Sequence, residues 1–190
     1  MDTTDPKIAF DSGGRCNHCR EYEATCAKLV YQGPTSDAEL KALAQVLKKQ
    51  SKGAPYDCVI GLSGGIDSSY VCYISKQLGL RPLAVHLDNG WNSEEAVRNI
   101  KNICSQLEID YQSYVLNWND FRQIQLAFLR ASIVEAEIPT DVAIVGALHR
   151  VAAQHRVPFI LSGGNLATEA IMPRSWFYYP KDSKLFRAIC

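Results

Sequence analysis

The spacing of apolar residues along this chain predicts strands that alternate with helices. Continuous apolar runs predict buried strands at residues 57–62, 82–87 and 157–161, and residues 111–116 have the pattern of a further strand. Apolar residues recur at helical spacing, with capping and stop signals, over residues 36–51, 68–78, 92–107, 118–132 and 140–155. Strands that alternate with helices predict an α/β fold, in which crossover helices connect a parallel sheet.

The same pattern divides the chain into two parts. Residues 1–35 show little periodicity and many turn formers, whereas residues 36–190 form one periodic domain. The domain begins at a capping box, Ser36-Asp37-Ala38-Glu39, and its last six residues, 185–190, are largely apolar. Because chain ends are usually polar, we expect a domain truncated at its C-terminus. The aromatic residues 176–179 either begin a sugar-stacking surface or pack against the missing region.

Composition narrows the class of protein. Of 190 residues, 47% are hydrophobic, which is typical of a globular chain, and 20 basic residues balance 20 acidic ones. Because the charges balance, the composition gives no sign of the excess positive charge that is typical of nucleic-acid-binding proteins. No apolar run reaches the roughly 18 residues of a membrane span, and the N-terminus carries no signal peptide. We therefore expect a cytoplasmic protein without a membrane partner, whose seven cysteines are reduced and in which Cys58 and Cys72 are buried.

Glycine-containing turns follow three of the predicted strands. Ser63-Gly64-Gly65 follows the first, Asp88-Asn89-Gly90 the second, and Ser162-Gly163-Gly164-Asn165 the fourth. In parallel sheets the carboxyl ends of the strands share one edge, and ligands bind there. The three turns together predict a nucleotide site.

The first turn has the chemistry of a phosphate loop. It opens a helix, whose first N–H groups bind anions, and Gly64 and Gly65 allow phosphate to approach the backbone. Ser63 and Ser68 add hydroxyl donors, while Asp67 orients the loop or helps to hold magnesium. No lysine follows the glycines, which excludes the Walker pattern, and the glycine spacing excludes the dinucleotide fingerprint. The alternative is a glycine-rich turn that binds nothing.

The segment Ser63-Gly64-Gly65-Ile66-Asp67-Ser68 resembles the SGGxDS signature of the N-type ATP pyrophosphatases, the PP-loop superfamily. The resemblance implies a Rossmann-like sandwich of the adenine nucleotide alpha hydrolase type, with ATP and Mg²⁺ as cofactors. It also implies cleavage between the α and β phosphates and transfer of AMP to a carbonyl oxygen. A nitrogen or sulfur nucleophile then displaces AMP.

A closer resemblance is to the N-acetyl sugar amidotransferases of bacterial surface-polysaccharide (lipopolysaccharide) synthesis. It rests on residues 84–93 and 162–169, and on Phe10-Asp11 with Cys16-Asn17-His18-Cys19. It implies an ATP-dependent ligase that converts an acetamido group of a nucleotide-linked sugar into an acetamidino group. The ammonia comes from a partner glutaminase through a partner channel-forming subunit.

The residues and the resemblance together give a set of candidate site residues. Asp67 and Ser68 are the catalytic candidates, and Asp67 and Asp88 are the candidates for magnesium. The nucleotide-binding candidates are Ser63, Gly64, Gly65, Asp67, Ser68, His86, Leu87, Asp88, Gly163, Gly164, Asn165, Thr168 and Glu169. For His86 the alternative is a merely buried strand residue, and for residues 163–169 it is a turn with a helix cap.

Cys16-x-x-Cys19 is half of a zinc site, because structural zinc takes four ligands. In the family that the chain resembles, an earlier Cys-x-x-Cys precedes the segment matching residues 1–6. Zinc is therefore expected only if that pair is present, and residues 1–35 form an incomplete finger-like segment.

Two other functions remain open. One is tRNA thiolation, which uses the same ATP chemistry and predicts a basic surface and a cysteine near the loop edge. The other is a non-catalytic module that binds ATP without turnover.

Overall fold

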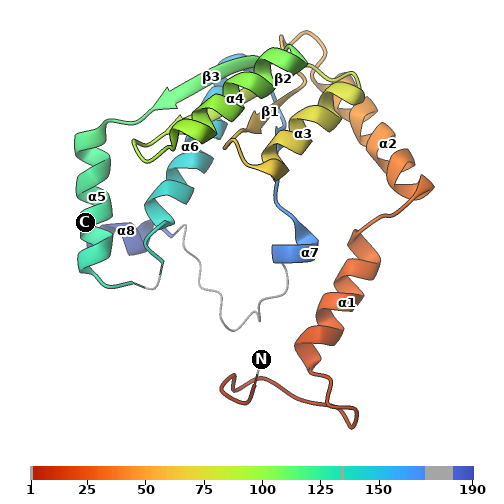
Figure 1. The fold of residues 1–190 in the computed structure, drawn as a ribbon, viewed down its shortest axis with the longest axis vertical. Helices are drawn as coiled ribbons and strands as arrows, with labels where there is room; N and C mark the ends of the chain where they lie inside the picture. Colours follow the sequence, from red (N-terminus) through yellow and green to blue (C-terminus); the bar gives the residue numbers. More distant parts are fainter. Residues whose placement is uncertain (1, 134, 170–181) are drawn as a thin grey trace. The chain divides into compact units, whose positions relative to one another are not determined.

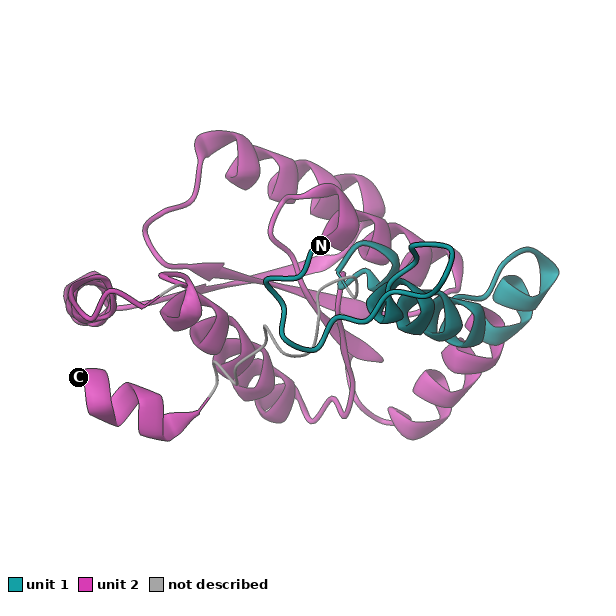
Figure 2. Ribbon diagram, turned by 90° about the horizontal axis from the view of Figure 1, so that it is seen from below, with its two compact units in different colours: residues 1–39, 164–179 teal, residues 40–163, 180–190 magenta. Residues whose placement is uncertain are grey.

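The computed structural model describes residues 2–133, 135–169 and 182–190 and divides the chain into two units. Unit 1 comprises residues 1–39 and 164–179, and unit 2 comprises residues 40–163 and 180–190 (Figure 2). The aromatic residues 176–179, predicted to stack on a sugar or to pack against a missing region, lie outside the described residues.

Unit 2 is built around a parallel four-stranded sheet with the strand order β3-β2-β1-β4 (Figure 1). The strands are β1 (Cys58–Gly61), β2 (Pro82–Asp88), β3 (Asp110–Val115) and β4 (Ile160–Leu161). The helices are α2 (Pro34–Gln50), which begins in unit 1, α3 (Ile66–Gln77), α4 (Glu94–Leu107), α5 (Trp118–Arg130), α6 (Ile138–His155) and α8 (Ser183–Ile189). The predicted α/β fold with a parallel sheet is confirmed.

Helices cover both faces of this sheet because the chain reverses direction across it. From β1 it crosses through α3 to β2 and through α4 to β3, and it then returns through α5 and α6 to β4 on the other side of β1. Right-handed crossovers place helices on opposite faces when the direction of winding changes. The reversal creates a switch point between β1 and β4, where open α/β sheets bind ligands.

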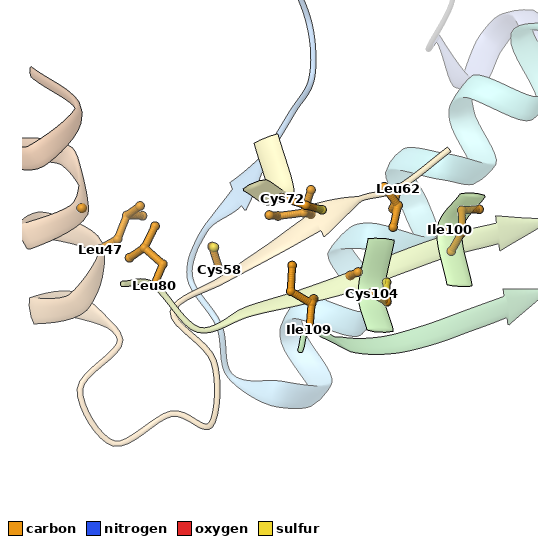
Figure 3. Close-up of a cluster of buried hydrophobic side chains, with 11 residues drawn as sticks. Leu47, Cys58, Leu62, Cys72, Leu80, Ile100, Cys104 and Ile109 are labelled. Carbon is orange, nitrogen blue, oxygen red and sulfur yellow. The ribbon is translucent and has the colours of Figure 1, made fainter. Parts of the chain in front are cut away.

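Alternating side chains of β1 serve two separate cores. Cys58 and Ile60 belong to a cluster with residues of α2, α3 and α4, and Figure 3 shows this cluster with Leu47, Cys72 and Cys104 among its members. Val59, on the opposite face of the sheet, packs with residues of β2 and α6. Each β1 residue here is fully buried, which explains the continuous apolar run in the sequence.

Burial makes the core cysteines unreactive. Cys58 and Cys72 are inaccessible to solvent, as predicted, and burial raises the pKa of each thiol to about 12. Cys190, by contrast, is exposed, and all seven cysteines are free thiols. We expect iodoacetamide at pH 8 to modify Cys190 in the folded chain and Cys58 and Cys72 only after denaturation. Peptide mass spectrometry measures this, and rapid modification of Cys58 in the native protein would contradict the packing.

The N-terminal segment differs from the prediction of little regular structure. In unit 1, α1 (Asn17–Leu29) forms a 13-residue helix, whose N-cap Cys16 accepts a hydrogen bond from the Cys19 amide. Unit 1 also contains the short helix α7 (Leu166–Glu169), and the Tyr22 hydroxyl donates to the Ala167 carbonyl at 2.6 Å. The sequence prediction missed α1 because its apolar face is weak and its cap is a cysteine rather than serine or aspartate.

Element boundaries shift by a few residues elsewhere. The helix predicted from residue 68 begins at Ile66, and the predicted strand 157–161 is reduced to Ile160–Leu161.

Among the described residues, no helix is both long and apolar enough to cross a bilayer.

Candidate functional site

A pocket of about 240 Å³ lies in unit 2 where three strands end. The end of β1 contributes residues 61–63, β2 contributes residues 85–87, and β4 contributes residues 161–163. Ile144 and Leu148 of α6 form an apolar wall. We call this site the strand-end pocket. It lies at the switch point of the sheet, where the three glycine-containing turns were predicted to meet.

The loop between β1 and α3 is held in shape by its own serines. Ser68 is buried, and its hydroxyl oxygen lies 3.1 Å from the Ser63 hydroxyl and accepts a hydrogen bond from the Ser63 amide at 3.3 Å. The Ser68 hydroxyl also lies 3.2 Å from the Gly65 carbonyl. Ser68 therefore fixes the loop from within, whereas Ser63 is exposed and lines the pocket.

The first turn of α3 provides backbone donors. Gly65 is the N-cap and has no side chain to satisfy the first amides of the helix. A helix leaves its first N–H groups without intrahelical partners, and the helix dipole favours an anion there. Gly65 and Asp67 are both exposed in this turn. The arrangement suits a phosphate group that approaches the backbone.

The surrounding protein imposes different constraints on the three glycines of the site. Gly64 has φ +82°, and a Cβ there would lie 2.6 Å from the Ala96 carbonyl oxygen of α4. Gly163 has no positive φ, but a Cβ would lie 3.0 Å from the Ser68 amide nitrogen. Gly65 has φ −80°, and a Cβ would meet nothing closer than 3.4 Å. Protein packing thus requires Gly64 and constrains Gly163, while the protein itself leaves room for a side chain at Gly65.

The end of β2 brings His86 and Leu87 to the pocket wall. His86 is buried, and its Nδ1 donates to the Leu62 carbonyl at 3.1 Å, which makes Nε2 the acceptor of the neutral ring. Nε2 is buried and has no partner among the described residues. An unpartnered buried acceptor is costly, and a bound ligand or water that reached it would remove that cost. Both sequence interpretations of His86 are compatible with this placement.

Asp88 mainly orders the loop that follows β2. Its Oδ1 accepts hydrogen bonds from the Gly90 amide at 3.1 Å and from the Asn92 side chain at 3.2 Å. The carboxylate is half-buried and is not among the residues that line the pocket.

The strand-end pocket has features that a nucleotide phosphate can use. The strand-end pocket has a buried orphan acceptor at His86 and free helix-terminal amides beside it. Among the described residues, no group of three or more His, Cys, Asp or Glu side chains gathers to hold a metal ion. Asp67, which is exposed, and the second oxygen of Asp88 could each contribute to a magnesium ion held chiefly by phosphate oxygens.

The last predicted loop residues belong to unit 1. Gly164, Asn165, Thr168 and Glu169 lie there, and Asn165 Oδ1 accepts from the Ala167 amide at 3.0 Å at the start of α7. This is the helix-cap geometry that the sequence left open as the alternative. Their role toward a nucleotide stays a prediction.

The structure adds pocket residues that the sequence did not single out. They are Asn89 and Asn92 of the loop after β2, and Thr140 of α6. The Asn89 side chain lies 3.4 Å from the Thr140 hydroxyl and joins the loop to α6. Asp141 lies next to Thr140 in the first turn of α6. From the sequence, Thr140 could have been found only through its position at the start of a helix that faces the ends of the strands.

The Cys16 and Cys19 sulfurs lie 3.4 Å apart in unit 1, close enough to share one metal ion. The Nε2 atom of His18 contacts Asp5 at 2.6 Å. Cys26 lies seven residues beyond Cys19 on the same helix, which separates the two by roughly 10 Å along its axis. Among the described residues no group of three or more potential metal ligands gathers here, so zinc stays a prediction that depends on a further cysteine pair.

The family model described as NAD synthase matches residues 38–143, which include the phosphate loop, the loop after β2 and most of the sheet. The chain belongs to the NAD synthase family. This family lies within the PP-loop ATP pyrophosphatase superfamily of ATP-using amidotransferases, ligases and tRNA thiolases, so ATP binding by the SGGxDS-type loop is a property of the group.

Individual relatives of this NAD synthase family member share the fold at low identity. The glutamine-dependent NAD⁺ synthetase of Acinetobacter baumannii, solved with ADP, is 20% identical with a TM-score of 0.56, over 86% of this chain and 31% of that one. The NH₃-dependent NAD synthetase of Campylobacter jejuni is 18% identical with a TM-score of 0.50, over 67% of this chain and 56% of that one.

A relative matched by sequence points to a second activity within the superfamily. The tRNA(Ile)-lysidine synthase of Chlamydia pneumoniae is 33% identical over 60 residues, which are 30% of this chain and 19% of that protein. The chain spans less than a third of the length of the curated relatives that it matches.

Proposed function

We propose that this chain is the ATP-binding core of an AMP-forming amidotransferase that acts on an N-acetylated, nucleotide-linked sugar. The observation that carries the ATP chemistry is the loop of residues 63–68, which opens α3 beside a strand-end pocket with an orphan acceptor. The resemblance of residues 84–93 and 162–169 to sugar amidotransferases supports the acceptor class.

The reaction proceeds in two steps that conserve atoms and charge. The carbonyl oxygen of the acetamido group attacks the α-phosphorus of ATP, and the bond to the β-phosphate oxygen breaks to release pyrophosphate. Ammonia then adds to the activated carbon, and the bond between that carbon and the AMP oxygen breaks. The product is an acetamidino sugar, with the excess protons passed to solvent.

The chain's own residues position and stabilise rather than attack. The first amides of α3 stabilise the departing phosphates, and Gly65 lets the phosphates approach the backbone. Ser68 keeps the loop in its binding conformation, and residues 86 and 87 form the wall against the adenosine. Magnesium, when bound, neutralises charge on the leaving pyrophosphate, with Asp67 and Asp88 as the candidate protein ligands.

We infer that ammonia reaches the site from a partner glutaminase through a channel-forming subunit. We infer both partners from the resemblance to the sugar amidotransferases, and an assay that omits them tests whether they are needed. Ammonium salts should replace them in vitro, so the isolated chain can be assayed with ammonium.

Product analysis tests the proposal. The chain is incubated with ATP, Mg²⁺, ammonium and a panel of uridine-diphosphate-linked N-acetyl sugars, and AMP, ADP and pyrophosphate are separated by ion-exchange chromatography. We expect AMP and pyrophosphate in equal amounts, dependent on one sugar. Asp67→Ala should lower the rate at least tenfold, because the exposed carboxylate in the first turn of α3 is a candidate ligand for the magnesium ion that neutralises the leaving pyrophosphate. Asp120→Ala is the matched control, since Asp120 is an exposed acid in the first turn of α5.

Other outcomes favour other functions. ADP and phosphate as products contradict the pyrophosphatase mechanism. Nucleotide binding without turnover supports a non-catalytic ATP-binding module.

A tRNA arm tests the other reactions of the superfamily, with sulfide for thiolation and with lysine for the reaction after which the lysidine synthase relative is named. The strand-end pocket weighs against sulfur transfer, because none of the described residues that line it is a cysteine. Cys58, Cys72 and Cys104 are instead buried in the core.

A further inference from the structure

A second pocket of unit 2 lies on the other side of the loop that follows β2. It has a volume of about 370 Å³, within the range of about 300–1,000 Å³ that is usual for small-molecule sites. Its walls include Trp91, Trp118, Arg122, Gln125, Leu129 and Glu137. We call it the tryptophan pocket, and it shares no lining residue with the strand-end pocket.

Two indole rings give this pocket flat apolar surfaces that remain accessible. Trp91 is 66% exposed and Trp118 is 41% exposed, and their ring centroids lie 5.4 Å apart with an angle of 73° between the planes. Trp91 Nε1 donates to Gln125 Oε1 at 2.6 Å. This bond satisfies the polar edge of Trp91, so the ring is held in place and its face is available to a ligand.

The position of Trp118 is built into the loop. Gly90 has φ +83°, and a Cβ there would lie 2.8 Å from Trp118 Cε3. Asp88 holds the same loop through the Gly90 amide and the Asn92 side chain. The tryptophan pocket is therefore a prearranged surface rather than a chance exposure of two side chains.

Two opposite charges also line the tryptophan pocket. Within residues 2–133, 135–169 and 182–190, the side chains of Arg122 and Glu137 form no hydrogen bond or ion pair. Both side chains are exposed, so water satisfies them in the free protein, and a ligand that covers them must replace that water with hydrogen bonds of its own. A neutral ring with one apolar face and several hydroxyl groups satisfies all four side chains, because hydroxyls both donate and accept.

The tryptophan pocket and the strand-end pocket are neighbours. Asn89 and Asn92 line the strand-end pocket, while Trp91 between them lines the tryptophan pocket. Adjacent residues of one loop therefore line different pockets, and this loop is the part of the chain that the two pockets share as a wall. A ligand in the tryptophan pocket can extend a substituent toward a nucleotide in the strand-end pocket.

We propose that the tryptophan pocket holds the pyranose ring of the acceptor sugar, with its acetamido group directed toward the α-phosphate of ATP. This inference rests on the proposed function for its chemistry, but binding to the pocket is measurable without turnover. Trp91 packs against the C–H face of the ring, while Arg122 and Glu137 bind its hydroxyls.

The test compares Trp91→Ala with the full wild-type chain. We expect Trp91→Ala to raise the KM for the sugar nucleotide roughly tenfold, the loss of one aromatic contact, and to leave the Kd for ATP unchanged. Tyr111→Ala is the matched control, because Tyr111 is a partly exposed aromatic at the start of β3, away from both pockets. Arg122→Gln should raise the same KM severalfold without affecting ATP.

Direct binding separates this inference from the proposed function. Saturation-transfer NMR is recorded with methyl N-acetyl-β-glucosaminide, with uridine diphosphate alone and with the intact sugar nucleotide. Signal from the sugar ring protons that disappears in Trp91→Ala supports the inference, whether or not AMP is formed. Binding of uridine diphosphate alone that depends on Trp91 would assign the pocket to the base and overturn it. Sugar-dependent AMP formation with an unchanged KM in Trp91→Ala would also overturn the inference but would leave the proposed function standing. The absence of sugar binding to the wild type would overturn the inference as well, and it would count against the proposed sugar acceptor too.

Discussion

Replacing Gly64 by alanine is expected to displace the phosphate loop, to slow AMP formation and to destabilise unit 2. A side chain at φ +82° is strained, and the added Cβ would lie 2.6 Å from the Ala96 carbonyl oxygen. The atoms that the Cβ would meet belong to the backbone of α4. No flexible side chain can move aside to make room, so the loop itself must move. We expect a loss of about 3 kcal/mol in the free energy of unfolding. A displacement of the phosphate loop by about 1 Å should lower the rate of AMP formation about 100-fold.

Gly65→Ala is the matched control within the same loop. Its φ of −80° suits any residue, and the nearest atom would be 3.4 Å from the new Cβ. Its free energy of unfolding should therefore change by less than about 0.5 kcal/mol. If phosphate approaches this N-cap, Gly65→Ala should still weaken ATP binding, measured by calorimetry. Equal stability of the two variants in urea unfolding would contradict the packing of Gly64 against α4.

Replacing Asp57 by asparagine is expected to cost about 2 kcal/mol of stability, because it removes a buried carboxylate that accepts charge-assisted hydrogen bonds from the half-exposed Arg81. Asp57 is 2% exposed; Oδ1 accepts from Arg81 Nη2 and the Ser51 hydroxyl, and Oδ2 accepts from the Arg81 amide and Nε. An asparagine NH₂ would face donors on whichever side it lay. These bonds join the end of α2 to the start of β2. Urea unfolding monitored by circular dichroism measures the loss.

The same pair makes stability depend on pH in the acid range. Burial by itself raises the pKa of Asp57, but the hydrogen bonds from Arg81 and Ser51 outweigh it and lower the pKa from 3.8 to about 2. A lowered folded-state pKa contributes stability that is present above about pH 4 and lost as the pH falls toward 2. This component should disappear in Asp57→Asn. Asp110→Asn, an exposed partner of Tyr56, is the control and should unfold like the wild type.

The local patterns of the chain were sufficient for the fold class. Strand residues such as Val59 and Ile60 are apolar on both sides because helices cover both faces of the sheet, and this continuity is visible in the sequence. Ser93 caps α4 through the Ala96 amide, as the sequence indicated. The boundaries were less certain: β4 keeps only two paired residues, and α1 was missed because its signals are weak.

The candidate site was predicted in part. The loop of residues 63–68 was found because its chemistry is contiguous, and the order of strands and helices predicted a common edge for the three turns. Thr140 and the apolar residues of α6 join that edge only through the crossover that returns to β4. Their contribution depends on which helix packs against which strand end, and local propensity carries no such information.

By itself, the sequence determined the alternation of strands and helices, the phosphate loop and the superfamily to which that loop belongs. Only the tertiary structure decided which of the glycines the packing of the protein requires. Gly64 is confined by the backbone of α4 and Gly163 by the first turn of α3, whereas Gly65 is free of protein contacts that would exclude a side chain. Only the tertiary structure brought Trp91 and Trp118 together at the side of the same loop. Such contacts join residues that are far apart along the chain, so they are fixed by packing and not by any local pattern.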